Sequence, residues 1–224
     1  MAVANLLDLN KIKQELVVFL RNQNIFSIST RGVTTTNDTG TFSSDSTHLI
    51  NVNNIKNVRN VEVDSSDLVF GTDYVIDYTY DDSGTKKCKI TFTSAQTGDY
   101  DIEYDYGTDK IYPDFPRTDL HIDSYPRIGV AITSTITDEN ELGAGSNTTE
   151  LLISVYVYAN GMENVDDYIQ KIRQKVLENK NGFYYLRFVT PVTQSPLVNE
   201  PLRADKIYTR TIELKCPLNI EVIS

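Results

Sequence analysis

Residues 98–107 read Gly-Asp-Tyr-Asp-Ile-Glu-Tyr-Asp-Tyr-Gly, an alternation of acidic and apolar side chains between two glycines. Successive side chains of a β-strand point to opposite faces, so an extended backbone here places four carboxylates on one face. Three tyrosines and an isoleucine then lie on the other face. This stretch therefore predicts one half-buried strand.

The same period of two occurs twice upstream, in residues 73–80 and 87–93. The side chains expected to point inward from these two strands are Tyr74, Ile76, Tyr78, Tyr80, Cys88, Ile90 and Phe92. The turn signals Asp81-Asp82-Ser83-Gly84 and Thr97-Gly98 connect the three stretches, which predicts three antiparallel strands with 87–93 in the middle.

Charge pairs should fix the register of these strands. Lys87 and Lys89 are expected opposite Asp77 on one side, and opposite Asp101 or Glu103 on the other. Opposite charges across a ladder contribute roughly 0.2 to 1 kcal/mol each.

The three strands belong to a longer acidic block. Residues 47–52 and 58–63 add two short β-rich runs, and residues 62–109 contain twelve acidic and three basic side chains. Several short strands at regular spacing favour a small β-sandwich. Because the block has its own charge balance and its own periodicity, it is predicted to be a separate domain over residues 33–110.

Outside this block the apolar residues recur every three to four positions, as in helices. A first amphipathic helix is predicted from Asn5 to Asn22, with Asn5 and Asp8 resembling a capping box. A second is predicted with Asn164 as its cap and Asn181-Gly182 as its stop. The N-terminal helix is not expected to be stable alone, so its apolar stripe must pack on the sheet formed by the residues after 117.

Four strands are predicted after the acidic block, over residues 128–136, 151–159, 183–190 and 207–216. Long loops are expected at 138–147 and at 191–206, and the second of these contains three prolines. The predicted fold class is therefore α+β. Two helices pack on a mostly antiparallel sheet in a discontinuous core formed by residues 1–32 and 111–224, into which the β-sandwich is inserted.

Composition excludes several classes of protein. The chain has 224 residues with 40 % hydrophobic residues, and no apolar run approaches the length of a bilayer span, so no membrane association is expected. The beginning of the sequence does not resemble a secretory signal, and Cys88 and Cys216 have no metal or redox spacing, which predicts reduced thiols and assembly in a cytoplasm. A net charge of −10 argues against tight binding of nucleic acid.

Neither a catalytic site nor a cofactor site is predicted. The sequence lacks a nucleophile elbow, a phosphate-binding glycine motif and a Cys/His metal signature. Asp119, His121 and Asp123 alternate and could ligate a metal, but alternate polar residues are the ordinary solvent face of a strand. The acidic ladder Asp99 to Asp105 lacks the spacing of a calcium loop, so a solvated face is the better interpretation.

Two sets of residues leave alternatives open. The fourteen tyrosines could form a sugar-binding platform, although inward cross-strand positions explain most of them better. Arg117 and Arg127 each follow a proline and could pair with a carboxylate of a neighbouring subunit. Pairing within the same subunit is an equal alternative for both arginines.

The order of the elements carries a resemblance to a protein family. An N-terminal amphipathic helix, the strand Tyr125-Pro126-Arg127-Ile128-Gly129-Val130, the strand 151–159, a helix and a long final pair ending Ile212-Glu213-Leu214-Lys215-Cys216 resemble the tail-terminator or tail-completion proteins of long-tailed phages and archaeal tailed viruses. The segments Gly71-Thr72-Asp73-Tyr74, Ile90-Thr91-Phe92 and 98–107 resemble immunoglobulin-like domains that decorate viral tail and neck proteins.

This resemblance implies a structural virion protein without enzymatic activity. It would form a ring, commonly of six subunits, that caps the tail tube, contacts the tube protein and the head connector of the neck, and lets DNA pass without specific binding. The two long loops and the two arginines would then contact neighbours, and the expected contact residues are Arg117, Arg127, Leu142, Gly143, Leu197, Val198, Leu202 and Arg203. The alternatives are a β-sandwich binding module for a glycan or host protein, and a head-completion adaptor of the same virus.

Overall fold

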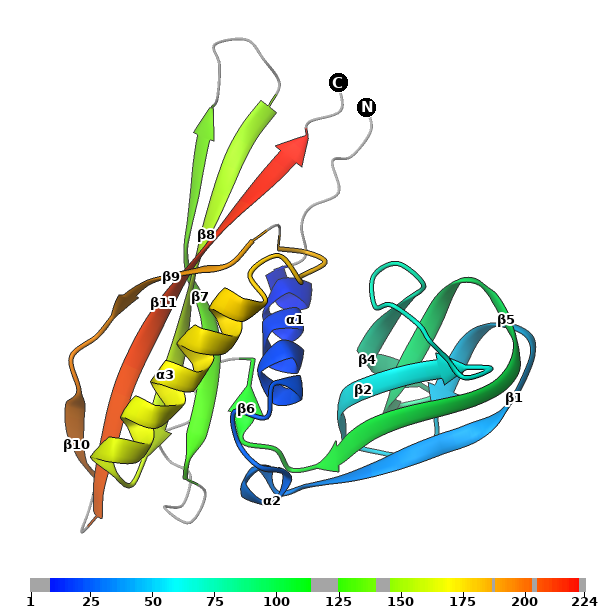
Figure 1. Cartoon of the computed structure of the whole chain (residues 1–224), viewed down its shortest axis with the longest axis horizontal. Helices are drawn as coiled ribbons and strands as arrows, with labels where there is room; N and C mark the ends of the chain where they lie inside the picture. The colour runs from blue at the N-terminus through cyan, green and yellow to red at the C-terminus, as the bar shows by residue number, and fades with distance from the viewer. Residues whose placement is uncertain (1–8, 114–124, 140–145, 187, 203–204, 222–224) are drawn as a thin grey trace. The chain divides into compact units, whose positions relative to one another are not determined.

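A computed structural model describes residues 9–113, 125–139, 146–186, 188–202 and 205–221 (Figure 1). The chain forms two compact units, one of residues 1–25 with 110–224 and one of residues 26–109. The described residues form three helices and two sheets in a mostly β structure, which confirms the predicted α+β class. The first boundary lies at residue 25 instead of the predicted 32, because the short helix α2 (Ile28–Arg31) belongs with the second unit.

The discontinuous unit contains α1 (Leu9–Asn22), α3 (Met162–Glu178) and a six-stranded sheet in the order β10-β11-β8-β7-β6, with β9 paired to β11. Its strands are β6 (Ile111–Tyr112), β7 (Arg127–Glu139), β8 (Ser146–Ala159), β9 (Thr190–Gln194), β10 (Val198–Leu202) and β11 (Asp205–Glu221). All pairings are antiparallel except that of β6 with β7.

Both helices lie on the same face of this sheet, and that face provides the core. Its central strand buries Leu151, Ile153, Val155 and Val157, the face that the alternation predicts. Ile212 and Leu214 of β11 are in register with two of these residues. The buried stripes of the helices complete the core with Ile12, Leu16, Leu20, Val165, Ile169, Ile172 and Val176.

The helix ends differ from the prediction. Gly161 is the N-cap of α3, three residues before the predicted cap Asn164, and it makes no side-chain cap hydrogen bond. The helix ends at Glu178, where Asn179 caps it, before the predicted stop. The predicted capping box at Asn5 and Asp8 lies outside the described residues.

The C-terminal third contains two errors of prediction. Of the predicted strand 183–190, residues 183–186, 188 and 189 are irregular, although Leu186 and Val189 are buried, and only Thr190 is in a strand, at the start of β9. The predicted loop 191–206 contains strands at 191–194 and 198–202, because β9 and β10 lie along one edge of β11 and pair with it. Ser195 connects them by donating its N–H to the Thr211 carbonyl and accepting the Thr211 N–H on its hydroxyl, both at 2.9 Å.

The second unit consists of α2 and one five-stranded sheet. Its strands are β1 (Val33–Ile50), β2 (Ile55–Val63), β3 (Ser66–Asp67), β4 (Tyr74–Asp82) and β5 (Thr85–Gly107). The predicted turn between β4 and β5 is confirmed: Asp82 pairs with Thr85 around Ser83-Gly84, and both turn residues have the positive φ that a tight hairpin requires.

The predicted turn at Thr97-Gly98 is wrong, because β5 continues through it. The first half of β5 pairs with β4 and the second half with β2, whereas β1 pairs with both halves. Lys89 is opposite Asp77 as predicted. Asp101, however, is opposite Thr39 and Glu62 instead of a lysine.

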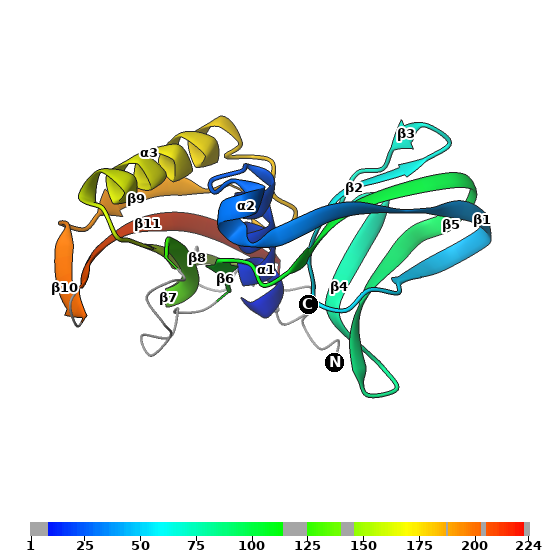
Figure 2. The same cartoon turned by 90° about the horizontal axis from the view of Figure 1, so that it is seen from below.

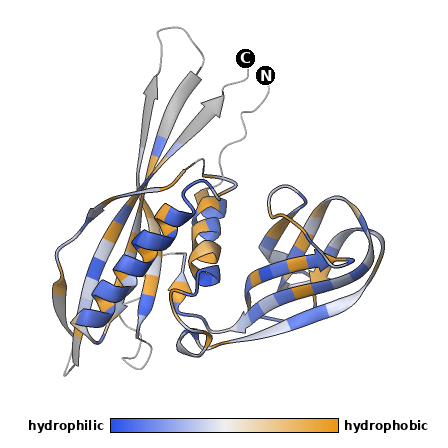
Figure 3. Ribbon diagram, viewed as in Figure 1, coloured by the Kyte–Doolittle hydropathy of each residue, from blue (hydrophilic) through white to orange (hydrophobic). Residues whose placement is uncertain are grey.

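The long strands β1 and β5 bend, so that one sheet surrounds its own core (Figure 2). Side chains from both halves meet there, among them Phe42, Ile50, Val61, Ile90, Phe92 and Ile102. The alternation that predicted the strands is visible as alternating hydrophobic and hydrophilic residues along the ribbons (Figure 3). This unit therefore contains one continuous sheet instead of the two separate sheets of the predicted sandwich, and register shifts in β1 at residues 43–47 mark the bend.

Candidate functional site

The predicted subunit contacts are only partly within the described chain. Val198 is 49 % exposed at the start of β10, Leu197 is half-buried just before it, and the backbone of Leu202 ends the same strand. The predicted contacts that lie outside the described residues are Arg117, Leu142, Gly143 and Arg203.

Arg127 is placed inside its subunit. It begins β7, is only 2 % exposed, and holds its guanidinium over the ring of Tyr125 at 5.2 Å from the centroid. Burial lowers the pKa of Lys110, and the charge of Arg127 lowers it further. This position favours the contact within one subunit over the contact between subunits for this arginine.

The edge formed by β9 and β10 is a surface that the loop prediction did not anticipate. Pro191 and Pro201 lie in the two strands and Pro196 lies between them. Proline has no backbone N–H, so it interrupts the row of donors that a further strand would need. Val192 and Val198 are exposed along this edge, which therefore can contact a partner through side chains more readily than by extending the sheet.

Three strands extend beyond the two helices (Figure 1). Pairing of β7 with β8 continues to Glu139 and Asn147, and pairing of β8 with β11 continues to Ser146 and Glu221. The strands therefore reach further than the predicted loop 138–147 allows, and only residues 140–145 separate them. Neither α1 nor α3 lies along this three-stranded extension (Figure 1).

Glu15 of α1 organises an exposed aromatic segment after α3. Its carboxylate accepts the backbone N–H groups of Tyr184 and Tyr185, the second at 3.0 Å, while Phe19 contacts Phe183 with ring centroids 4.9 Å apart. Burial raises the pKa of Glu15, and the backbone hydrogen bonds act against that rise. Tyr184 remains 54 % exposed. This segment is rich in aromatic residues, which are common in strands, so the sequence suggested a strand instead.

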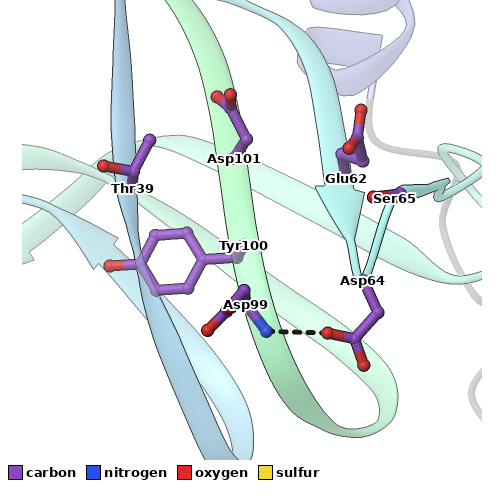
Figure 4. A pocket seen from close by; sticks show the side chains of 7 residues that line it. All are labelled: Thr39, Glu62, Asp64, Ser65, Asp99, Tyr100 and Asp101. Carbon is purple, nitrogen blue, oxygen red and sulfur yellow. Dashed lines mark hydrogen bonds between the residues drawn. The ribbon is translucent and has the colours of Figure 1, made fainter.

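The unit of residues 26–109 has an acidic hollow on the outer side of its sheet (Figure 4). Its lining consists of Thr39, Glu62, Asp64, Ser65, Asp99, Tyr100 and Asp101. Asp64 closes one side by accepting the Asp99 N–H at 2.9 Å. A Cβ on Gly98 would lie 2.2 Å from the carboxylate of Asp64, so this approach depends on a glycine.

The carboxylates of the hollow come from neighbouring strands and have no lysine or arginine partner among the described residues. Asp101 is directly opposite Glu62, and the polar contacts in the structure are from Asn37 to Asp101 at 2.5 Å and from Thr41 to Asp99 at 2.7 Å. No lysine or arginine of the described residues forms an ion pair with Glu62, Asp64, Asp99 or Asp101. Such a surface repels anions and attracts basic groups.

A metal site is not formed by the described residues, in which no three His, Cys, Asp or Glu side chains are grouped to hold an ion. Asp119, His121 and Asp123 lie outside them. The inward position predicted for tyrosines is confirmed for Tyr74 and Tyr104, which are buried. Tyr100 stacks on Phe42 with centroids 4.2 Å apart and is therefore part of the packing instead of a sugar platform.

The described nucleophile candidates are poorly suited to chemistry. Cys88 and Cys216 are free and buried, and burial raises the pKa of each thiol to about 12, with Asp77 and Glu15 respectively adding to the rise. Both thiols are therefore protonated at neutral pH. The Asp38 carboxylate accepts a hydrogen bond from His48 Nε2 at 2.8 Å, and the His48 ring lies against the rings of Phe42 and Tyr100.

Among the described residues, none of the helices combines the length and the apolar character needed to cross a bilayer. Comparison of the sequence with models of known protein families and with curated proteins found no match.

Proposed function

We propose that the chain is a structural subunit of a viral tail or neck, which assembles into a closed ring at the end of the tail tube and has no enzymatic activity. The observation on which this rests is the three-stranded extension of β7, β8 and β11 beyond α1 and α3. An extension of this kind projects beyond the rest of the unit and can contact a neighbouring subunit. The element order that resembles tail terminators supports the same proposal.

A ring closes when one face of each subunit meets a different face of the next. The discontinuous unit offers two different surfaces for such a contact. One is the extension, and the other is the edge of β9 and β10 with Val192 and Val198 exposed. Because prolines interrupt that edge, the contact would be made by side chains, and the ring would not become an open-ended sheet.

The charge of the chain is compatible with a channel for DNA. Residues 26–109 contain 14 acidic and 6 basic residues, a net charge of −8, and the whole chain has −10. A bore formed by such subunits would not attract phosphates by counterion release, so DNA could pass without being held. The same charge opposes self-association of free subunits, which are expected to assemble on the end of the tube.

Cryo-electron microscopy of the assembled particle tests this proposal. Copies of the chain are expected in a ring, most simply of six, between the tail tube and the head connector. Lysates that lack the protein are expected to contain tails of uncontrolled length, or tails without heads. If the chain lay on a distal fibre or baseplate, and if tail length and head joining were normal in its absence, the proposal would be wrong.

A second candidate is a binding module, favoured by the acidic hollow of residues 26–109. Glu62, Asp64, Asp99 and Asp101 lie together there without a lysine or arginine partner among the described residues. A basic surface of a host or viral protein fits this chemistry better than a glycan, since Tyr74 and Tyr104 are buried. Glycan-array binding would favour the glycan version, whereas salt-sensitive capture of a basic protein would favour the first.

A further inference from the structure

The chain passes between the two units twice, after residue 25 and after residue 109. Each unit contains a buried arginine close to the points at which the chain passes into the other unit. Arg31 lies five residues after Phe26, where the chain enters the unit of residues 26–109, and Arg21 lies four residues before Ile25, where the chain leaves the other unit. Neither arginine stands out in the sequence, since the residues that contact them are 74 to 90 positions away.

Arg31 joins the beginning of its unit to the end. Its Nη1 donates to Asp105 of β5 at 2.8 Å, and its Nη2 donates to Asp109, the last residue of the unit, at 2.5 Å. Its Nε also donates to Asp109, at 3.2 and 3.3 Å from the two carboxylate oxygens. All three side chains are buried.

The charges of this cluster are matched. The second oxygen of Asp105 accepts hydrogen bonds from Arg59 Nε and from the Thr35 hydroxyl, each at 2.7 Å. Two guanidinium groups and two carboxylates therefore form a neutral network. Removal of one member of a buried network leaves an uncompensated charge, so each member depends on the others.

The backbone segments at the two ends of this unit also lie in close contact with each other. The Gly32 carbonyl accepts the N–H and the hydroxyl of Thr108, at 3.4 and 3.1 Å, and the β1–β5 ladder begins one residue further at Val33 and Gly107. Gly107 has a φ of +128°, and a Cβ there would lie 2.9 Å from the Gly32 carbonyl oxygen. The two ends of the unit are thus brought together by glycines as well as by charge.

Arg21 has the corresponding position in the other unit. It is buried near the end of α1 and donates from Nη2 to the Ile111 carbonyl of β6 at 2.6 Å. The next hydrogen bond joins the Ile128 N–H of β7 to the Lys110 carbonyl at 2.9 Å. The residues on either side of the insertion are therefore bonded to each other within their own unit.

We propose that Arg21 and Arg31 each hold together, within their own unit, the segments at which the chain enters and leaves that unit. Local unfolding of each unit then begins in its other segments before it reaches these ends. Arg31 acts through Asp105 and Asp109, and Arg21 acts through the Ile111 carbonyl. The consequence is that neither unit frays where the chain enters and leaves it. This role is independent of the proposed ring.

Hydrogen exchange of the full chain tests the proposal. In the natural protein the amides of Gly32 and Gly107 are expected to exchange as slowly as that of Ile102 in the core of β5. In Arg31→Met the Gly32 and Gly107 amides are expected to exchange about 100-fold faster, whereas Ile90 and Phe92 in the other half of the unit change much less. Arg21→Met is expected to accelerate the Ile128 amide and to leave residues 26–109 unchanged.

Lys87→Met is the matched control for Arg31→Met, because it removes a part-buried ion pair with Asp82 in the same unit, away from the Arg31 network. It is expected to leave Gly32 and Gly107 as slow as before. Equal acceleration of every amide in the unit by Arg31→Met would overturn the proposal, and so would unchanged exchange at Gly32 and Gly107. If Arg31→Met does not fold, exchange in the unsubstituted protein still tests the proposal. Fast exchange of the Gly32 and Gly107 amides there would show that the ends of the unit are open, and the proposal would be wrong.

Discussion

The two units stabilise a sheet in opposite ways. The discontinuous unit covers one face of its sheet with α1 and α3 and has a nearly even charge balance, with the remaining −2 of the net −10. The unit of residues 26–109 has only the four-residue helix α2, bends its sheet around its own apolar core and has −8. A sheet without covering helices can therefore still enclose a core if its long strands bend. Its outer surface then carries carboxylates such as Asp99 and Asp101.

Removal of the inserted unit should have the largest effect on this comparison. If Ile25 is joined to Lys110 by a short Gly and Ser linker, the remaining chain is expected to fold and to melt cooperatively. The reason is that the apolar face of β8 and the stripes of α1 and α3 belong to this unit alone, and Arg21 already bonds to Ile111. Calorimetry and the dispersion of amide resonances measure the outcome. A molten product would mean that the two units depend on each other.

Cavities in the two cores should separate the units quantitatively. Ile153→Ala in β8 and Ile102→Ala in β5 each remove buried methyl groups, and each is expected to cost about 2 to 5 kcal/mol of unfolding free energy. If the units unfold separately, each variant shifts one thermal transition and leaves the other in place. Val75→Ala, at an exposed position of β4, is the control and should shift neither transition appreciably. Two equal shifts in either cavity variant would contradict independent unfolding.

The two units differ in what their sequences could predict. Alternation identified β4, most of β5 and the buried face of β8, because a strand with one buried face imposes a period of two. The continuation of β5 through Thr97-Gly98 could not be predicted, since a glycine next to a threonine also fits a turn and only its pairing with β1 decides. The strands β9 and β10 were hidden by Pro191, Pro196 and Pro201, which an edge position tolerates.

The candidate surfaces were less predictable than the fold. The acidic face was evident from the alternation for Asp99, Asp101 and Glu103, whereas Asp105 is buried against Arg31 and Arg59 and not solvated as predicted. The position of this face beside Glu62 and Asp64 depends on the register of β2. Glu15 gave no signal as a residue that binds the backbone at Tyr184, because this contact spans 169 positions. Interactions between residues so distant in sequence require the fold to be known first.

Acidity should affect the two units in opposite directions. Burial raises the pKa of Asp105, but Arg59, Thr35 and Arg31 together hold that pKa below its ordinary value. The stabilisation from Asp105 is therefore present above about pH 4 and is lost as the pH falls below it. Glu15 has a raised pKa because of burial, so its folded state binds the proton more tightly. The discontinuous unit therefore gains stability from Glu15 as the pH falls toward about 4.5.

Thermal melts between pH 7 and pH 3 measure this divergence. The transition of the discontinuous unit is expected to rise first, and the transition of residues 26–109 is expected to fall at the lowest pH. Glu15→Gln should remove the rise without changing the fall, and it keeps an oxygen that can accept the Tyr185 N–H. If Glu15→Gln left the rise intact, another carboxylate would be responsible.

The smallest expected effect concerns the acidic hollow. Glu62 is directly opposite Asp101, and Asp64 and Asp99 line the same hollow, so removing one charge should relieve repulsion. Glu62→Gln keeps the shape of the side chain and is expected to stabilise the unit of residues 26–109 by about 0.2 to 1 kcal/mol at low salt. Because salt screens exposed charges, this gain should shrink toward zero in about 1 M NaCl. Glu103→Gln is the matched control, since Glu103 in the same strand is opposite Asn37 and Asn60 instead of an acid, and it should give little gain. Equal gains from both variants would mean that the overall net charge of the unit, and not the hollow, sets the repulsion.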